Sequence, residues 1–241
     1  MKVYLISLFL LFTCSLTHAQ KLSAKTLATA DSLFAAKKYT ESFELYQHLL
    51  EEQRTASPAM LLKMSFIKEG LGDYANALYY INLYYLQTAD QKALDKMAEI
   101  AEAKDLQGYK SDDFDFAKTI FFKYFNYLII ILAALALLFA SIMVYQKKNS
   151  IRPVVPSIMT LIMLALLFYT LNFGREYHKA IIAQNDTYIM SGPSAGSDVL
   201  EITKKGHRLS VIGETDIWTL IEWQGQRAYI KSDKLKMVKF I

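Results

Sequence analysis

The side chains best suited to contact a ligand in this chain are aromatic, because a ring offers a large flat apolar face. Trp218 and Trp223 lie in one short β-branched run, and alternation along a strand places them on opposite faces. We therefore expect one tryptophan in a core and the other exposed. The predicted contact residues are Trp218, Trp223, Tyr229, Tyr188, Tyr80 and Tyr84. Structural packing is the alternative role for the tryptophans, Tyr229 and the two tyrosines of the N-terminal half.

No pattern of residues predicts a catalytic, cofactor or metal site. The chain has no Gly-x-x-x-x-Gly-Lys phosphate loop, and its four histidines are isolated from one another. The acidic run over residues 111–115 lacks the spacing and the closing Glu of a calcium loop, and we interpret it as a solvated helix start. The net charge of +4 is mild and no basic stripe interleaves with aromatics. We expect no enzyme activity, no cofactor, no metal and no nucleic-acid partner.

Two apolar runs organise the chain around a membrane hairpin. Phe125–Val144 and Val154–Phe173 each contain twenty residues and no charge. A helix of that length reaches ~30 Å, the thickness of the hydrocarbon core of a bilayer. The sequence therefore predicts spans over residues 125–145 and 154–174, joined by a turn at 146–153. A pair of buried core helices in a soluble protein is the alternative.

The N-terminal residues 1–19 have the pattern of a signal peptide, with a positive start, a short apolar stretch and a small residue before the expected cut. A lipoprotein site at Cys14 is the alternative, and a cut after residue 19 leaves no cysteine in the mature chain. Export of the segment after Gln20 sends the next domain outside, and two spans return the chain to that side. The turn then faces the cytoplasm, as its basic residues Lys147, Lys148 and Arg152 favour.

Residues 20–110 show helical periodicity with an internal repeat, and residues 111–124 form a juxtamembrane segment. Tyr39 and Tyr74 open equivalent helices 35 positions apart. The run Gly72-Asp-Tyr-Ala-Asn-Ala77 has the turn pattern of tetratricopeptide repeats, which this region resembles. The first repeat departs from the pattern, since Lys37 replaces the usual Gly and Ser42 the usual Ala. The resemblance implies paired helices that bind a peptide or a partner helix, followed by a capping helix over Thr88–Leu106.

Residues 180–241 change to short strands separated by Gly, Pro, Ser and Asp, which predicts a small all-β barrel. Gln224-Gly225-Gln226 is a predicted hairpin turn. This region resembles the bacterial SH3-like domain through Tyr188–Ser194, Leu200–Gly206, Arg208–Gly213, Trp218–Ile221 and Tyr229–Leu235. Met190 and Ala228-Tyr229 depart from the usual residues of that family. The resemblance implies contacts with cell-wall peptides or carbohydrate, or with protein surfaces.

The order of segments predicts a multi-domain membrane protein: an all-α helical repeat, a two-helix hairpin and an all-β barrel. This order resembles the BatE-type proteins of Bat aerotolerance operons. The resemblance implies a two-pass protein of the bacterial inner membrane whose two domains face the periplasm. It also implies a non-catalytic scaffold for Bat-type von Willebrand A proteins, beside a MoxR-type ATPase. The alternative is an envelope sensor that binds peptidoglycan through its SH3-like domain.

Overall fold

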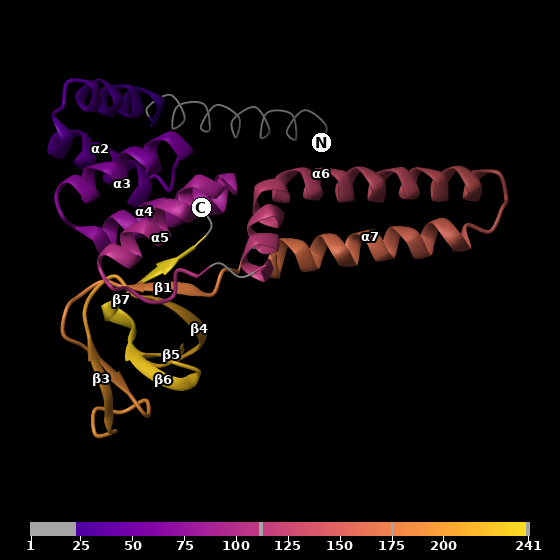
Figure 1. Ribbon diagram of the computed structural model, residues 1–241. Coiled ribbons are helices and arrows are strands. Elements are labelled where there is room, and N and C mark those ends of the chain that lie inside the picture. Colours follow the sequence, from indigo (N-terminus) through magenta and orange to yellow (C-terminus); the bar gives the residue numbers. More distant parts are fainter. Residues whose placement is uncertain (1–22, 111–112, 175, 240–241) are drawn as a thin grey trace. The chain divides into compact units, whose positions relative to one another are not determined.

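The structure is a computed structural model that describes residues 23–110, 113–174 and 176–239. The predicted signal peptide and Cys14 lie outside the described residues. The chain divides into two compact units at Tyr84 and Tyr85, and each unit is described by itself. The elements are labelled in Figure 1.

The first unit is helical. A helix over residues 23–35 is followed by α2 (Tyr39–Glu51), α3 (Pro58–Gly70) and α4 (Tyr74–Thr88), which continues past the boundary. Ser57 caps α3 by accepting a hydrogen bond from the Met60 N–H, and Pro58 occupies the first helical position, where its missing N–H costs nothing. One face of each helix is buried, and the core residues include Ala30, Phe43, Tyr46, Leu49, Leu61, Met64, Ala77, Leu78 and Ile81.

The turns that join these helices repeat after 35 residues. Lys37 and Gly72 both have positive φ, at 62° and 71°. The Lys38 N–H bonds the Leu33 carbonyl oxygen at 2.9 Å, and the Asp73 N–H bonds the Lys68 carbonyl oxygen at 2.9 Å. A lysine can therefore replace the glycine at this turn, although holding a non-glycine residue in the left-handed backbone region costs roughly 1–3 kcal/mol.

A buried hydrogen bond between paired helices also repeats, with donor and acceptor exchanged. The Ser42 hydroxyl donates to the Ala30 carbonyl oxygen at 2.9 Å. Thirty-five positions later, the Ser65 hydroxyl donates to the Ala77 carbonyl oxygen at 2.9 Å. Ser42 corresponds to Ala77 and Ala30 to Ser65, so each helix pair has one serine and one alanine at the same contact. The unit is thus an internal repeat of helix pairs.

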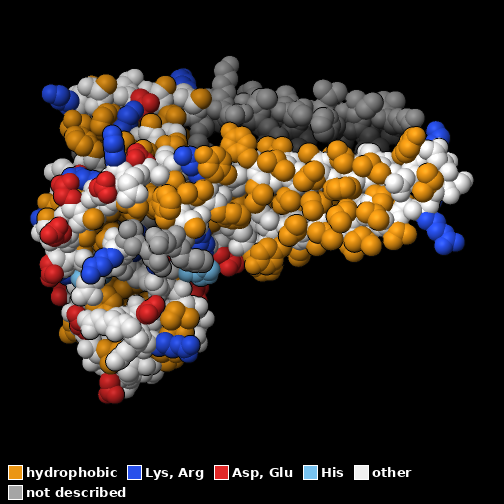
Figure 2. Space-filling view, turned by 45° about the vertical axis from the view of Figure 1, so that its right-hand side comes forward, with side chains coloured by type: hydrophobic (Ala, Val, Ile, Leu, Met, Phe, Trp, Pro, Cys, Tyr) orange, Lys and Arg blue, Asp and Glu red, His pale blue; other side chains and the backbone are white. Residues whose placement is uncertain are grey.

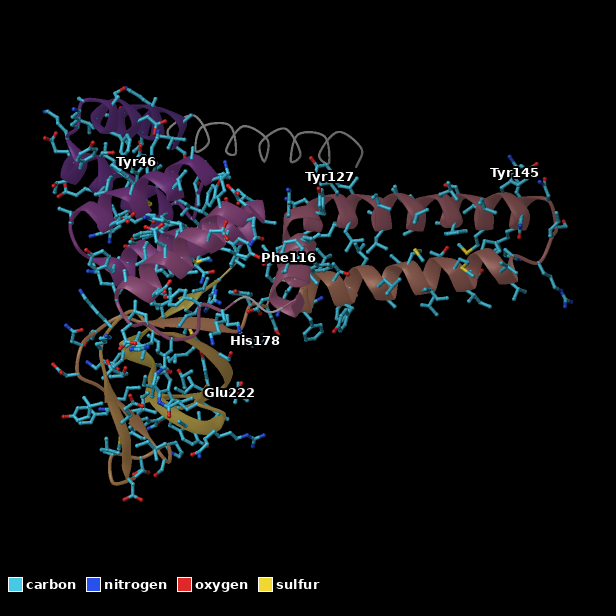
Figure 3. The ribbon with its side chains drawn as sticks, in the orientation of Figure 1. Tyr46, Phe116, Tyr127, Tyr145, His178 and Glu222 are labelled. Carbon is cyan, nitrogen blue, oxygen red and sulfur yellow. The ribbon has the colours of Figure 1, made fainter. Side chains whose placement is uncertain are left out.

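The second unit contains three further helices: α5 (Gln91–Ala103), α6 (Asp113–Lys148) and α7 (Val154–Phe173). Helix α6 begins at Asp113 and therefore includes most of the predicted juxtamembrane segment. Figure 1 shows that α6 changes direction early. Its short first limb carries Phe116, and its long limb, which carries Tyr127, runs antiparallel beside α7 (Figure 3).

Both hairpin helices are long and apolar enough to cross a membrane. Their most apolar windows have mean hydropathies of 2.8 and 2.2, and only 6% and 11% of those windows are buried. Figure 2 shows hydrophobic side chains covering the visible surface of the hairpin. A core helix of a soluble protein would have most of this surface covered by other elements, so the uncovered surface favours the membrane interpretation.

The C-terminal part of the second unit is a seven-stranded antiparallel sheet in the order β3-β2-β6-β5-β4-β1-β7. The strands are β1 (Lys179–Ile182), β2 (Thr187–Met190), β3 (Val199–Thr203), β4 (Arg208–Thr215), β5 (Trp218–Trp223), β6 (Gln226–Lys231) and β7 (Leu235–Val238), with a short 3₁₀ helix, η1 (Ser232–Lys234), before the last. The expected change to short strands in this part of the chain is confirmed.

The predicted turn between β5 and β6 is confirmed. Trp223 pairs with Gln226, so Gln224 and Gly225 are the two turn residues, with φ of 49° and 79°. Positive φ at both positions is the geometry that matches the twist of a two-residue hairpin. The core of the sheet consists of Ile182, Ile189, Leu209, Ile221, Trp223, Ala228 and Ile230.

Candidate functional site

A pocket of about 470 Å³ lies on the C-terminal sheet, on the face opposite its core. Strands β2, β3, β5 and β6, the loop between β2 and β3, and η1 all contribute to it. The lining residues are Asp186, Thr187, Tyr188, Met190, Ala195, Val199, Trp218, Lys231 and Lys234. With Asp186 from the turn before β2, residues from seven places in the chain meet at one concave surface, as in many small-ligand sites.

The strand register explains how the pocket forms. Trp218 pairs with Lys231 across β5 and β6, so both side chains project from the same face. The Lys231 ammonium lies 5.9 Å from the centre of the Trp218 ring, within range of a cation–π interaction. Trp218 is only 7% exposed, so a ligand would meet part of its ring surface.

Tyr188 and Val199 form the open side of this pocket, with exposed fractions of 53% and 48%. The charged lining residues are Lys231, Lys234 and Asp186. The Lys234 ammonium already makes one hydrogen bond, which it donates to the Gln184 side-chain oxygen at 2.7 Å. The pocket thus combines ring and aliphatic surface with two cations and one carboxylate. This combination suits a peptide or amino-sugar segment that carries a carboxylate.

Trp223 occupies a different environment, inside the core of the sheet. Its indole N–H donates to a Glu201 carboxylate oxygen at 2.7 Å, and its ring packs edge-to-face against His207 at 5.6 Å. It is 6% exposed. The opposite-face prediction for the two tryptophans is confirmed, but the prediction that one of them is exposed is wrong. The outer face is itself covered around Trp218 by neighbouring side chains.

Tyr229 is half-buried and does not line the pocket. It pairs with Met190 on one side and Leu220 on the other. The structure therefore brings together Trp218 and Tyr188 from the predicted set and leaves Tyr229 and Trp223 outside this pocket.

The two predicted tyrosines of α4 differ in burial. Tyr80 is 2% exposed, and its ring packs edge-to-face against Phe43 at 5.8 Å and Tyr79 at 5.2 Å. Burial raises the pKa of the Tyr80 phenol. Tyr80 is therefore a core residue, which agrees with structural packing, the alternative role for this tyrosine. Tyr84 is half-buried and stays a predicted contact.

Met190, Lys231 and Lys234 belong to the pocket but were absent from the sequence prediction. A signal for Lys231 existed. Counting outward in pairs from the two-residue turn at Gln224 and Gly225 places Lys231 opposite Trp218. Met190 and Lys234 depend on the approach of β2 and η1, which no local pattern in the sequence specifies.

A Gly-x-Ser-x-Gly pattern occurs at residues 192–196, and the sequence prediction missed it. In hydrolases this motif sits on a sharp turn from a strand to a helix. Here it occupies the loop between β2 and β3, and the Ser194 hydroxyl oxygen accepts a hydrogen bond from the Gly196 N–H at 3.2 Å. Among the described residues no histidine hydrogen-bonds to Ser194.

Within the described ranges, no group of three or more His, Cys, Asp or Glu side chains could hold a metal ion. Residues 186–236 match the family described as the bacterial SH3 domain. Every residue that lines the pocket falls within this matched segment. No curated protein and no solved structure matches the chain. The C-terminal part of the chain is thus a bacterial SH3 domain, a kind of domain that suits binding of protein or cell wall.

Proposed function

We propose that this protein is a non-catalytic, membrane-anchored adaptor whose SH3 domain holds a protein partner at the Trp218 pocket. The single observation that carries the proposal is the pocket itself. Its lining offers Trp218, Tyr188 and Val199 for apolar contact and Lys231 for a carboxylate. An anchoring aromatic residue in a pocket with a polar rim is the usual arrangement of an interaction hot spot.

A second partner would bind the helical repeat of the first unit. The support is the 35-residue recurrence of turn geometry at Lys37 and Gly72 and of the buried serine hydrogen bond. We propose that these pairs are tetratricopeptide repeats and that the chain acts as a BatE-type scaffold for Bat-type von Willebrand A proteins. Tethering two modest binding modules on one anchor raises their effective concentration without new contacts.

We further propose that the hairpin spans the bacterial inner membrane with both domains in the periplasm. The support is the basic turn between the two helices, with Lys147, Lys148 and Arg152. Protease added to intact spheroplasts should then cut both domains and spare the turn. Cleavage confined to one domain would contradict this topology.

The adaptor proposal is tested by crosslinking in cells followed by mass spectrometry of the captured proteins. Tyr188→Ala and Lys231→Gln should each reduce capture of a defined partner severalfold, because each removes one side of the pocket. Ile212→Ala is the matched control, since Ile212 is an exposed apolar residue of β4 that does not line the pocket. Partner capture that is equal for all three variants would overturn the proposed site.

Peptidoglycan is the second candidate ligand, and the observation that favours it is the pairing of two aromatic rings with charged groups of both signs. Aromatic faces stack on sugar rings, and the lysines could pair with stem-peptide carboxylates. The detergent-solubilised chain should then sediment with purified sacculi, and Tyr188→Ala should reduce that retention relative to Ile212→Ala. Absence of sedimentation would leave protein as the ligand.

A further inference from the structure

A second cavity, with a volume of about 730 Å³, lies in the second unit outside the SH3 pocket. It is bounded by α5, the segment after α5, β1 and β4. Its lining residues are Ala98, Ala101, Glu102, Leu106, Gln107, Gly108, Tyr109, Lys110, Lys179, Arg208, Leu209 and Ser210. Three of them are cationic and one is a carboxylate, so the lining carries a net positive charge.

Arg208 is the central feature of this cavity because it is buried, with 4% exposure. Its Nε–H donates to the Gly108 carbonyl oxygen at 2.7 Å, and its guanidinium lies 5.1 Å from the centre of the Tyr109 ring. Within the described part of the chain, no carboxylate forms an ion pair with it. A buried guanidinium without an anion is unusual, since removing its hydration costs several kcal/mol.

The other charges around the cavity do not neutralise Arg208. The Lys179 ammonium lies 3.1 Å from an Asp115 carboxylate oxygen and 3.2 Å from the Ser210 hydroxyl, so that pair is balanced. Lys110 is exposed on the lining, and Glu102 is the one lining carboxylate. An anion that entered the cavity would meet the Arg208 fork, the Ser210 hydroxyl and the Lys110 ammonium.

The cavity also lies next to the ends of the apolar hairpin. Lys110 precedes the start of α6 by three positions, and Lys179 follows the end of α7 by six. Asp115, the partner of Lys179, is in the first turn of α6. If the hairpin is inserted, these residues are close to the headgroup layer, where anionic lipids present phosphodiester groups.

We propose that this cavity binds a phosphate group, with Arg208 as the main ligand and Lys110 and Ser210 as supporting contacts. Arginine suits this role because its planar fork bonds two phosphate oxygens at once. The phosphate can belong to an anionic lipid headgroup or to a soluble phosphate ester, and the membrane-proximal position favours the lipid. Binding of a lipid as the source of the phosphate depends on the proposed membrane anchoring, whereas binding of the phosphate group itself does not.

The test uses the full-length chain in neutral detergent with phosphatidylglycerol added in a phosphatidylcholine background. Native mass spectrometry counts retained lipid. We expect Arg208→Gln to weaken retention roughly 10- to 100-fold, as loss of a charged hydrogen bond does, and Lys110→Gln to weaken it less. Lys123→Gln is the matched control, because Lys123 is an exposed lysine near the start of the span that does not line the cavity. It should leave retention unchanged.

Two further measurements can contradict the proposal: competition by inorganic phosphate and lipid retention by the Lys110→Gln variant. Inorganic phosphate in excess should compete with the lipid if the phosphate group alone is recognised, and should fail to compete if the headgroup is required. Lys110→Gln stays informative even if Arg208→Gln does not fold, because Lys110 is exposed. Retention of phosphatidylglycerol and phosphate that is unaffected by Lys110→Gln, or equally reduced by Lys123→Gln, would overturn the site.

Discussion

The Tyr109 hydroxyl donates a hydrogen bond to the Gly206 carbonyl oxygen at 2.6 Å, across 97 positions of sequence. Tyr109 precedes both apolar helices and Gly206 follows them, so this bond closes the base of the hairpin. The Gln107 N–H also donates to His207 Nδ1 at 3.0 Å, and the Arg208 N–H donates to the Gln107 carbonyl oxygen at 3.0 Å. The segment before α6 is therefore bound to the start of β4 by several hydrogen bonds.

Tyr109→Phe should loosen this attachment. The change leaves the Gly206 carbonyl oxygen without its partner at a buried position, which costs about 1–3 kcal/mol. Hydrogen exchange of the full chain in nanodiscs should show faster exchange in residues 104–110 and at the start of β4. Tyr188→Phe is the control, since Tyr188 is exposed, and protection unchanged in Tyr109→Phe would contradict the prediction.

Gly108→Ala should have a larger effect than Tyr109→Phe. A Cβ at residue 108 would lie 1.8 Å from the Arg208 carbonyl oxygen, and φ there is +89°. Backbone must move to admit the methyl group, so we expect a loss of at least about 2 kcal/mol of stability. Gly213→Ala in β4 meets nothing within 4 Å and should change the thermal midpoint little. Equal midpoints for the two variants would show that the segment does not pack on β4 as described.

The attachment should weaken in acid because His207 Nδ1 accepts a hydrogen bond and cannot do so when protonated. Burial lowers the pKa of His207 below its ordinary value of 6.5, and the nearby Lys204 ammonium lowers it further, while Glu201 and Asp105 oppose the shift. The folded state then binds fewer protons than the unfolded state, so stability falls as the pH drops below 6.5 towards the folded pKa.

A pH series of thermal midpoints between neutral and acidic conditions measures this effect. His207→Asn keeps an acceptor oxygen near the Nδ1 position without a titratable ring, so its midpoint should depend less on pH over the same interval. A pH dependence that is identical in both proteins would assign the acid sensitivity to other groups.

Substitution of the two tryptophans should affect different properties, stability for Trp223 and ligand retention for Trp218. Trp223→Phe removes the hydrogen bond to Glu201 and leaves space in the core, with an expected cost of about 1–3 kcal/mol. Trp218→Phe alters the pocket and leaves the core of the sheet intact, so ligand retention should fall more than stability does. The loss of stability is measured by denaturant unfolding, monitored by the hydrogen-exchange protection of the β-sheet. The loss of ligand retention is measured by the capture assay. The reverse order of effects would contradict the assignment of core and pocket.

Lys37→Gly should stabilise the first unit by up to about 1 kcal/mol. Lys37 has φ of 62°, which glycine adopts without strain, and the equivalent turn at Gly72 already uses glycine. Gly72→Ala should destabilise the same unit for the converse reason. Exchange protection of α2 and α3 in the full chain reports both changes, and opposite signs are required if the two turns are equivalent.

The sequence by itself determined most of the helices and strands that the structure describes. Apolar runs without charge predict most of α6 and α7, and each run has the roughly twenty apolar residues that a helix needs to cross a membrane. The turn at Gln224 and Gly225 defines the β5–β6 hairpin and its register, and the 35-residue spacing defines the helix pairs. These features follow from local composition and periodicity.

Only the tertiary structure decided which aromatic residues are accessible. Alternation placed Trp218 and Trp223 on opposite faces, but burial of both depends on what covers each face. The sequence allowed Tyr80 to contact a partner, but in the structure its ring packs on Phe43 in a core. The charged cavity at Arg208 is lined by residues of α5 and β4, which lie about one hundred positions apart in the sequence. Contacts over such separations depend on how whole elements pack, and no local pattern carries that information.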